Sequence, residues 1–380
     1  MRCPFRMQRP ARTAARCLAG LHPRRMLARR PLQIEMGPSV RTAILRTSIG
    51  GLAGMAASRL TEQAPQLVGA DGFEPWRLHF RSEIQALVAA LDDEAPERYA
   101  AHVAWLRKAN DARGTPPEQL RATFDALEFV LEQHLPGASD PMLRRCLDLA
   151  RAELSASTVA ASPAPAASPL ARDYLAAILD CDKVRALRAV EEALAAGTVQ
   201  PTQVLDEVLP YTQREIGELW HQGRIGIAEE HFATQVTRQC ISRLLARSQP
   251  PRADAPFVIV SSLQGDGHEI GVQLVACAFE LAGWRIAFLG ANTPIKDLAA
   301  LARRLHAQVV ALGGTLDEHR AAITAAVRAV REKSPLTRVI VGGAAFAGSE
   351  DLWRRTGADA IARSASATPL VASSLLSAAG

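Results

Sequence analysis

Asp266 and His268 stand two residues apart and are followed by Gly271, in the stretch 265–271, which reads Gly-Asp-Gly-His-Glu-Ile-Gly. Histidine is a common metal ligand, and a carboxylate at this spacing can accept a hydrogen bond from one ring nitrogen. That bond fixes the tautomer and leaves the other nitrogen for a metal ion. Gly267 and its glycine neighbours also remove side chains where a large, flat ligand needs close approach to the backbone. The motif predicts metal ligation by His268, although a helix-capping loop with a half-exposed histidine has the same spacing by chance.

The elements around this motif place His268 at one edge of a sheet. Residues 256–260 are an apolar, β-rich run typical of a buried parallel strand, and residues 272–282 form an apolar-periodic helix closed by Gly283. A residue between such a strand and such a helix lies at the carboxyl edge of the sheet, where open α/β sheets bind ligands. We therefore expect His268 to face a ligand there.

The remainder of the region 255–380 alternates strands with helices. Further strands are expected at 284–289, 308–312, 338–341 and 357–361, each followed by a turn or a helix. This pattern predicts a parallel, doubly wound sheet of five strands with the flavodoxin-like order. Its switch point, the usual ligand crevice, lies between the first and third strands.

A second group of polar and aromatic residues precedes the sheet. Trp220 and His221 are followed, after a glycine-containing turn, by Glu230 and His231. They fall between the last two of four helices predicted for residues 170–248. Taken alone, this pattern also fits a buried tryptophan that anchors a helix turn beside an ordinary polar surface.

The Asp-x-His-x-x-Gly motif resembles the signature of cobalamin-binding domains. With the Trp and Glu-His pattern, residues 170–380 resemble the cap and sheet module of the CarH and LitR type, the adenosylcobalamin photoreceptor regulators. The resemblance implies cobalamin, with adenosylcobalamin favoured and methylcobalamin as the alternative. It also implies that His268 is the lower axial ligand of cobalt and that Asp266 is the partner of its ring.

For the upper face of the corrin, the resemblance implies four further roles. Trp220 would pack on the adenosyl group, and Glu230 and His231 would form hydrogen bonds near it. His221 would become an upper axial ligand after light breaks the cobalt–carbon bond.

The resemblance also implies that the nucleotide tail lies in the crevice of the sheet, against Gly342 and Gly343. The family usually has a serine at the end of the third strand, where this chain has Gly313. Either Thr315 supplies the missing hydroxyl or the tail is held more loosely.

The N-terminal half differs in composition from this module. Residues 1–70 contain twelve arginines and two acids, a net charge of +10, so the remainder of the +5 chain carries −5. Three interpretations fit this basic composition: a targeting segment, a basic disordered arm, or a misassigned start codon. We favour the last, with Met36 or Met55 as the true start. Six scattered cysteines without metal-binding spacing favour a reducing, cytoplasmic setting.

Residues 73–155 read as a further helical domain of unknown role, and residues 156–169 as an Ala/Pro/Ser linker to the four-helix cap. No helix-turn-helix of the MerR type with a basic recognition helix is visible. No apolar run is long enough to span a bilayer. We therefore expect neither a direct nucleic-acid reader nor a membrane protein.

These features lead to a hypothesis of a non-catalytic, light-responsive regulator that binds adenosylcobalamin between cap and sheet. Its output would pass to a transcription factor, a signalling protein or a second copy of the chain. The main alternative is a corrinoid carrier in methyl transfer, since such carriers combine the same cap and sheet. The upper-face residues favour an adenosyl group over a methyl group. A further alternative is a non-enzymatic module with a degenerate, empty site, and Gly313 is its best support.

Overall fold

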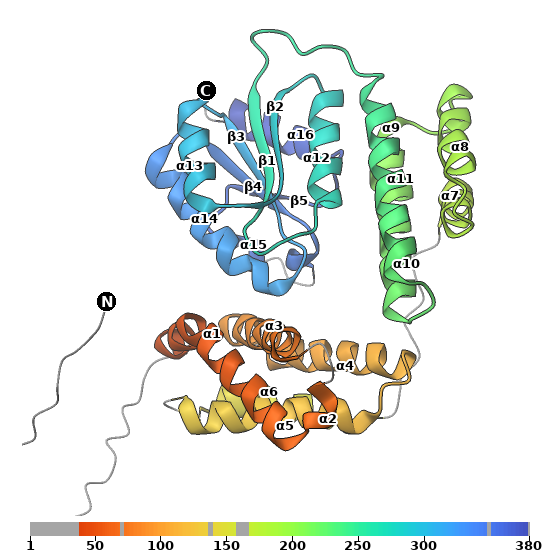
Figure 1. Ribbon diagram of the computed structural model, residues 1–380. Helices are drawn as coiled ribbons and strands as arrows, with labels where there is room; N and C mark the ends of the chain where they lie inside the picture. The colour runs from red at the N-terminus through yellow and green to blue at the C-terminus, as the bar shows by residue number, and fades with distance from the viewer. Residues whose placement is uncertain (1–37, 69–71, 136–139, 157–166, 348–350, 379–380) are drawn as a thin grey trace, which may run out of the picture. The chain divides into compact units, whose positions relative to one another are not determined.

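The computed structural model describes residues 38–68, 72–135, 140–156, 167–347 and 351–378 (Figure 1). Most of the Arg-rich arm, including Met36, and most of the predicted linker lie outside these residues. The described part consists of an N-terminal helical bundle, a helical cap and a parallel sheet. Within it, no helix combines the length and the apolar character that crossing a bilayer requires.

Five parallel strands form the sheet in the order β2-β1-β3-β4-β5. They are β1 (Phe257–Leu263), β2 (Arg285–Thr293), β3 (Val309–Gly313), β4 (Arg338–Gly342) and β5 (Ala360–Ala362). The order is flavodoxin-like, which confirms the predicted fold class and places the switch point between β1 and β3. The end of β2 differs from the predicted strand 284–289: β2 continues through residues 290–293, where a turn was expected. Register shifts keep its end paired with β1, so that Leu263 lies opposite Thr293.

Helices cover both faces of this sheet (Figure 1). They are α12 (Ile270–Leu281), α13 (Ile295–Arg304), α14 (Arg320–Lys333), α15 (Asp351–Arg354) and α16 (Thr368–Ser377), with 3-10 turns η2 (Asp317–His319) and η3 (Ala344–Phe346). α12 is apolar on two sides. Val272 and Phe279 pack on the sheet, whereas Leu274 and Cys277 pack in the core of the cap. A helix buried from both sides must be apolar around most of its circumference.

The cap contains the four predicted helical segments. They are α7 (Pro169–Leu179), α8 (Lys183–Ala195), the continuous run of α9 (Pro201–Gln203), η1 (Val204–Val208) and α10 (Leu209–His221), and α11 (Ile227–Leu245). η1 is a π-helical turn just before Pro210, because proline removes one backbone donor and clashes with the preceding turn. The run of α9 to α10 ends at Trp220 and His221, so it positions both of these residues.

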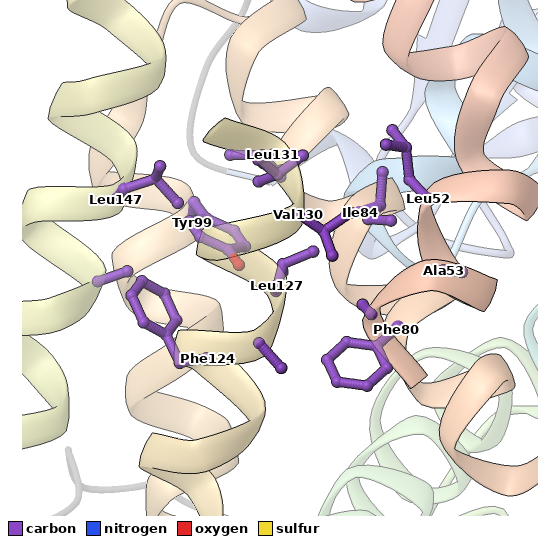
Figure 2. Packing of buried hydrophobic residues seen from close by; sticks show 14 of the residues in the cluster. Leu52, Ala53, Phe80, Ile84, Tyr99, Phe124, Leu127, Val130, Leu131 and Leu147 are labelled. Atoms are coloured by element: carbon purple, nitrogen blue, oxygen red, sulfur yellow. The ribbon is translucent and has the colours of Figure 1, made fainter. Parts of the chain in front are cut away.

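The N-terminal bundle begins with two helices, one long and one of a single turn, that the sequence reading did not include. Its helices are α1 (Pro38–Gln63), α2 (Pro65–Val68), α3 (Phe73–Asp92), α4 (Pro96–Ala112), α5 (Pro117–His134) and α6 (Pro141–Ser155). Leu52 and Ala53 of α1 are buried in one cluster with Phe80 and Ile84 of α3 (Figure 2). The prediction of an arm through residue 70 is therefore wrong for α1. Its core stripe mixes leucine with alanine, and its glycines lower helix propensity, so its helical pattern is weak in sequence.

A buried ion pair lies inside the bundle, where Nε2 of His102 is 2.9 Å from Oε1 of Glu83. Burial alone would raise the pKa of Glu83 and lower the pKa of His102, but their mutual attraction reverses both shifts. The stability that protonated His102 contributes to the folded state is therefore fully present below its ordinary pKa. It is lost as pH rises through the raised pKa. We expect the free energy of unfolding, measured in urea titrations, to fall as pH rises above about 6.5, the ordinary pKa of histidine. Glu83→Gln should flatten that fall, and Glu74→Gln on the surface of α3 should leave it unchanged.

Candidate functional site

Asp266 and His268 lie in the loop that joins β1 to α12, at the carboxyl edge of the sheet. Asp266 is only 2% exposed, whereas the side chain of His268 is 60% exposed. Nδ1 of His268 lies 2.9 Å from Oδ1 of Asp266, and the backbone N–H of His268 donates to the same oxygen at 3.0 Å. The predicted pairing is therefore present, and Nε2 is the ring nitrogen that Asp266 does not hold.

The charge of this pair follows from its hydrogen bonds. Burial alone would raise the pKa of Asp266, but hydrogen bonds from His268 and His319 outweigh burial and hold that pKa far below the usual range. Asp266 is therefore an ionised acceptor at neutral pH. Its hydrogen bond raises the pKa of His268, and the negative charges of Glu230 and Glu318 add to this effect. A metal ion at Nε2 would have to displace a firmly held proton, so its binding weakens as pH falls.

The second carboxylate oxygen of Asp266 has two partners that the sequence reading did not assign. The backbone N–H of Thr315 donates to Oδ2 at 3.0 Å, and Nδ1 of His319 lies 3.0 Å from the same atom. Thr315 thus meets Asp266 through its backbone. The suggested role of its hydroxyl in holding a nucleotide tail stays a prediction. His319 was missed because it becomes a neighbour of Asp266 only once β3 pairs with β1. The one available signal was a histidine shortly after a strand at the predicted switch point.

The loop around His268 leaves open space beside its backbone. A Cβ atom added to Gly265, Gly267 or Gly271 would meet no atom of the described structure within 4 Å. Asn292, at the end of β2, holds this loop. Its backbone N–H donates to the carbonyl of Asp266 at 3.1 Å, and its Oδ1 accepts from the N–H of Gly265 at 3.0 Å. The three glycines therefore form a cradle that side chains would otherwise fill.

The other glycines at this edge are in contact with the protein itself. A Cβ on Gly313 would lie 2.4 Å from Cγ1 of Val272, and one on Gly343 would lie 2.3 Å from the carbonyl oxygen of Gly314. A Cβ on Gly342 would lie 2.8 Å from a carbonyl oxygen of β5. Close packing of the chain on itself is therefore sufficient to require these glycines. Contact of Gly342 and Gly343 with a nucleotide tail stays a prediction.

The cap residues Trp220 and His221 are both covered by α4 of the N-terminal bundle. The guanidinium of Arg113 lies over the ring of Trp220, 4.8 Å from its centroid, and donates to the carbonyls of Trp220 and His221. The ring of Trp105 stacks on His221 with centroids 4.2 Å apart, and His221 is only 2% exposed. In this arrangement His221 cannot reach a ligand unless Trp105 moves.

Glu230 and His231 lie at the start of α11. Oε1 of Glu230 accepts a hydrogen bond from Thr234 at 2.9 Å. The side chain of His231 is 73% exposed, with Nε2 3.7 Å from Oε2 of Glu230. The negative charge of Glu230 also raises the pKa of His268. Contact of Glu230 and His231 with a group on the upper face of the corrin stays a prediction.

The N-terminal bundle also contacts the turn that carries His319. Arg98 of α4 donates from Nε to Asp317 Oδ2 at 2.6 Å, and Arg320 pairs with Asp93 of α3. Arg320 also donates to Asp317 at 2.5 Å. The pairs Arg98–Asp317 and Arg320–Asp93 were not expected from the sequence, because each joins residues on separately predicted domains. Together with the Arg320–Asp317 pair, they hold η2 against the N-terminal bundle.

Comparison with known proteins identifies the cap and the sheet. Residues 257–372 match the family model described as a B12 binding domain, and residues 170–245 match a second model with the same description. The chain contains a B12-binding module. This module, residues 170–372, includes both His268 and the predicted cap residues, so the prediction of cobalamin binding is confirmed at that level. The exposed Nε2 of His268 and the open glycine cradle fit a cobalt ion held in a flat macrocycle.

Curated proteins to which the chain is similar include corrinoid proteins. Over 138 residues the chain is 28% identical to trimethylamine corrinoid protein 1 of Methanosarcina acetivorans, which covers 36% of this chain and 63% of that protein. Over 205 residues it is 25% identical to dimethylamine corrinoid protein 3 of the same organism. This match covers 53% of this chain and 93% of that protein. The monomethylamine corrinoid protein of Methanosarcina barkeri aligns with a TM-score of 0.47 and 19% identity, covering 53% of this chain and 96% of that structure.

Proposed function

We propose that the protein is a corrinoid carrier, which holds cobalamin in the B12-binding module and presents a methyl group to partner methyltransferases. The observation that carries this proposal is the exposed Nε2 of His268, whose opposite ring nitrogen is held by the ionised Asp266. The relatives named as trimethylamine and dimethylamine corrinoid proteins support the choice of methyl transfer.

In this proposal, residues of the sheet domain would bind one face of the corrin and residues of the cap would cover the other. When bound, cobalamin supplies a cobalt centre that can take up and release a methyl group. His268 would hold that centre from the side of the sheet, and Asp266 would keep its imidazole in the required tautomer. The cradle of Gly265, Gly267 and Gly271 would let the macrocycle approach the backbone. Trp220 and Glu230 belong to the cap, and in this proposal they exclude water from the opposite face.

A light-responsive regulator was the leading interpretation of the sequence, and the comparisons favour the carrier instead. That interpretation depended on Trp220, His221, Glu230 and His231 as a pocket for an adenosyl group. In the structure, His221 is buried beneath Trp105, so its ligation of cobalt would require a rearrangement. The protein partner that we propose is accordingly a methyltransferase on each side of the transfer, in place of a transcription factor.

Reconstitution with two forms of the cofactor distinguishes these functions. The protein would be incubated in the dark with methylcobalamin or adenosylcobalamin, passed through a desalting column and examined by visible spectroscopy. We expect retention of methylcobalamin with the spectrum of a histidine-ligated form. Trp220→Ala should weaken the binding of methylcobalamin and of adenosylcobalamin to a similar degree. A selective loss of adenosylcobalamin binding, together with a light-dependent change of oligomeric state, would support the regulator. Failure to retain any cobalamin would contradict both.

A further inference from the structure

The hydrogen-bond requirements of Asp266 point to a role for His319. An ionised carboxylate offers about four acceptor sites, and a buried one needs donors at most of them. The side chain of Asp266 is 2% exposed. Oδ1 receives the backbone N–H and the ring Nδ1 of His268, and Oδ2 receives the N–H of Thr315. Among the described residues, His319 is placed to supply the fourth donor, because its Nδ1 lies 3.0 Å from Oδ2.

Nδ1 of His319 has a competing partner, because the backbone N–H of Leu316 points at it from 3.1 Å. One nitrogen cannot donate to Asp266 and accept from Leu316 at the same time. A hydrogen bond to a charged group is roughly twice as strong as one between neutral groups. Leu316 also lies in an exposed position, at 44% exposure. The proton therefore belongs on Nδ1, where it serves Asp266.

The surroundings of His319 hold its ring in this position. Its side chain is 10% exposed, and it ends the turn η2. The neighbouring Asp317 is tied to Arg98 and Arg320, and Glu318 stands between Asp317 and His319 in the chain. With η2 fixed in this way, the ring of His319 is positioned by the fold and does not depend on a bound ligand.

We propose that His319 is a positioning residue for the lower axial ligand of cobalt. By donating from Nδ1 to Oδ2, it fixes the carboxylate of Asp266, whose Oδ1 in turn orients the ring of His268. This inference rests on the proposed function, in which His268 binds the cobalt of cobalamin.

The test compares two substitutions of similar size. His319→Asn keeps an N–H donor near the position of Nδ1, whereas His319→Leu removes it. The first readout uses the protein without cobalamin: long-range proton–nitrogen correlation spectra report which nitrogen of His268 carries the proton. The second readout is the dissociation constant and visible spectrum of bound methylcobalamin. Thermal unfolding of each variant establishes that it is folded.

We expect the unsubstituted protein and His319→Asn to show a proton on Nδ1 of His268. His319→Leu should show mixed tautomers and a dissociation constant raised about 10–100-fold, the usual cost of losing such a partner of a metal ligand. If His319→Leu does not fold, His319→Gln replaces it, because its amide lies one bond further out and should not restore the bond.

The proposal is overturned if His319→Leu leaves the tautomer of His268 and the affinity unchanged, or if His319→Asn is as damaging as the variant without a donor. The spectra of the cobalamin-free protein make this result independent of the proposed function. If the unsubstituted protein does not bind methylcobalamin, the carrier function fails while the tautomers still decide the role of His319.

Discussion

Protein in which His268 is replaced by alanine is expected to lose the visible spectrum of histidine-ligated cobalamin. Nε2 of His268 is the exposed nitrogen of the Asp266–His268 pair, and alanine removes the donor without filling the glycine cradle. Loss of a partner of a metal ligand usually costs about 10–100-fold in affinity, so loss of the ligand itself should cost at least as much. Equilibrium binding of methylcobalamin, followed by its spectrum, measures both effects.

The matched control is His134→Ala. His134 is an exposed histidine at the end of α5, outside the B12-binding module. Its replacement should leave the spectrum and the affinity unchanged. An unaltered histidine-ligated spectrum in His268→Ala would mean that another residue binds the cobalt, and the assignment of the lower ligand would then be wrong.

Gly343→Ala is expected to destabilise the sheet domain by about 3 kcal/mol or more. Gly343 has a φ of +100°, a conformation that strains any residue with a Cβ atom. The added Cβ would also lie 2.3 Å from the carbonyl oxygen of Gly314 and 3.1 Å from its nitrogen. Those atoms belong to the backbone and cannot rotate away, so β3 and β4 would have to separate at their ends. Urea unfolding followed by circular dichroism measures the loss.

Gly265→Ala separates the strain from the clash. Gly265 has nearly the same φ, +99°, but its added Cβ would meet no described atom within 4 Å. We therefore expect it to cost only the conformational strain, about 1–2 kcal/mol. Because its Cβ would enter the cradle beside His268, it should weaken methylcobalamin binding. Equal destabilisation by the two substitutions would show that the contact with Gly314 does not matter.

The parts of this protein that could be read from sequence are those governed by local interactions. Strands and helices alternate visibly after residue 255, and the sheet order follows from the rules of parallel crossover connections. The pairing of Asp266 with His268 was predictable because two residues of separation bring the carboxylate to the ring. The exposure of His268 followed from its place between a strand and a helix.

Local signals failed where the residues are small or where their use depends on packing. α1 was missed because its buried face mixes leucine with alanine and its sequence contains glycines, which weakens the helical pattern. Gly343 was recognised, but its physical reason was not, because only the folded chain brings Gly314 against it. The covering of His221 by Trp105 likewise joins residues from separate helical regions.

The amino-acid sequence predicted a metal-ligating histidine on a loop, its carboxylate partner, and a flavodoxin-like sheet preceded by a helical cap. The tertiary structure alone decided what holds the far side of that carboxylate. His319 and Thr315 reach Asp266 only because β3 pairs with β1 and η2 then turns back over the strand ends. A buried carboxylate needs hydrogen-bond donors at both of its oxygens. The local motif supplies donors only from His268, so the others must come from residues distant in the sequence.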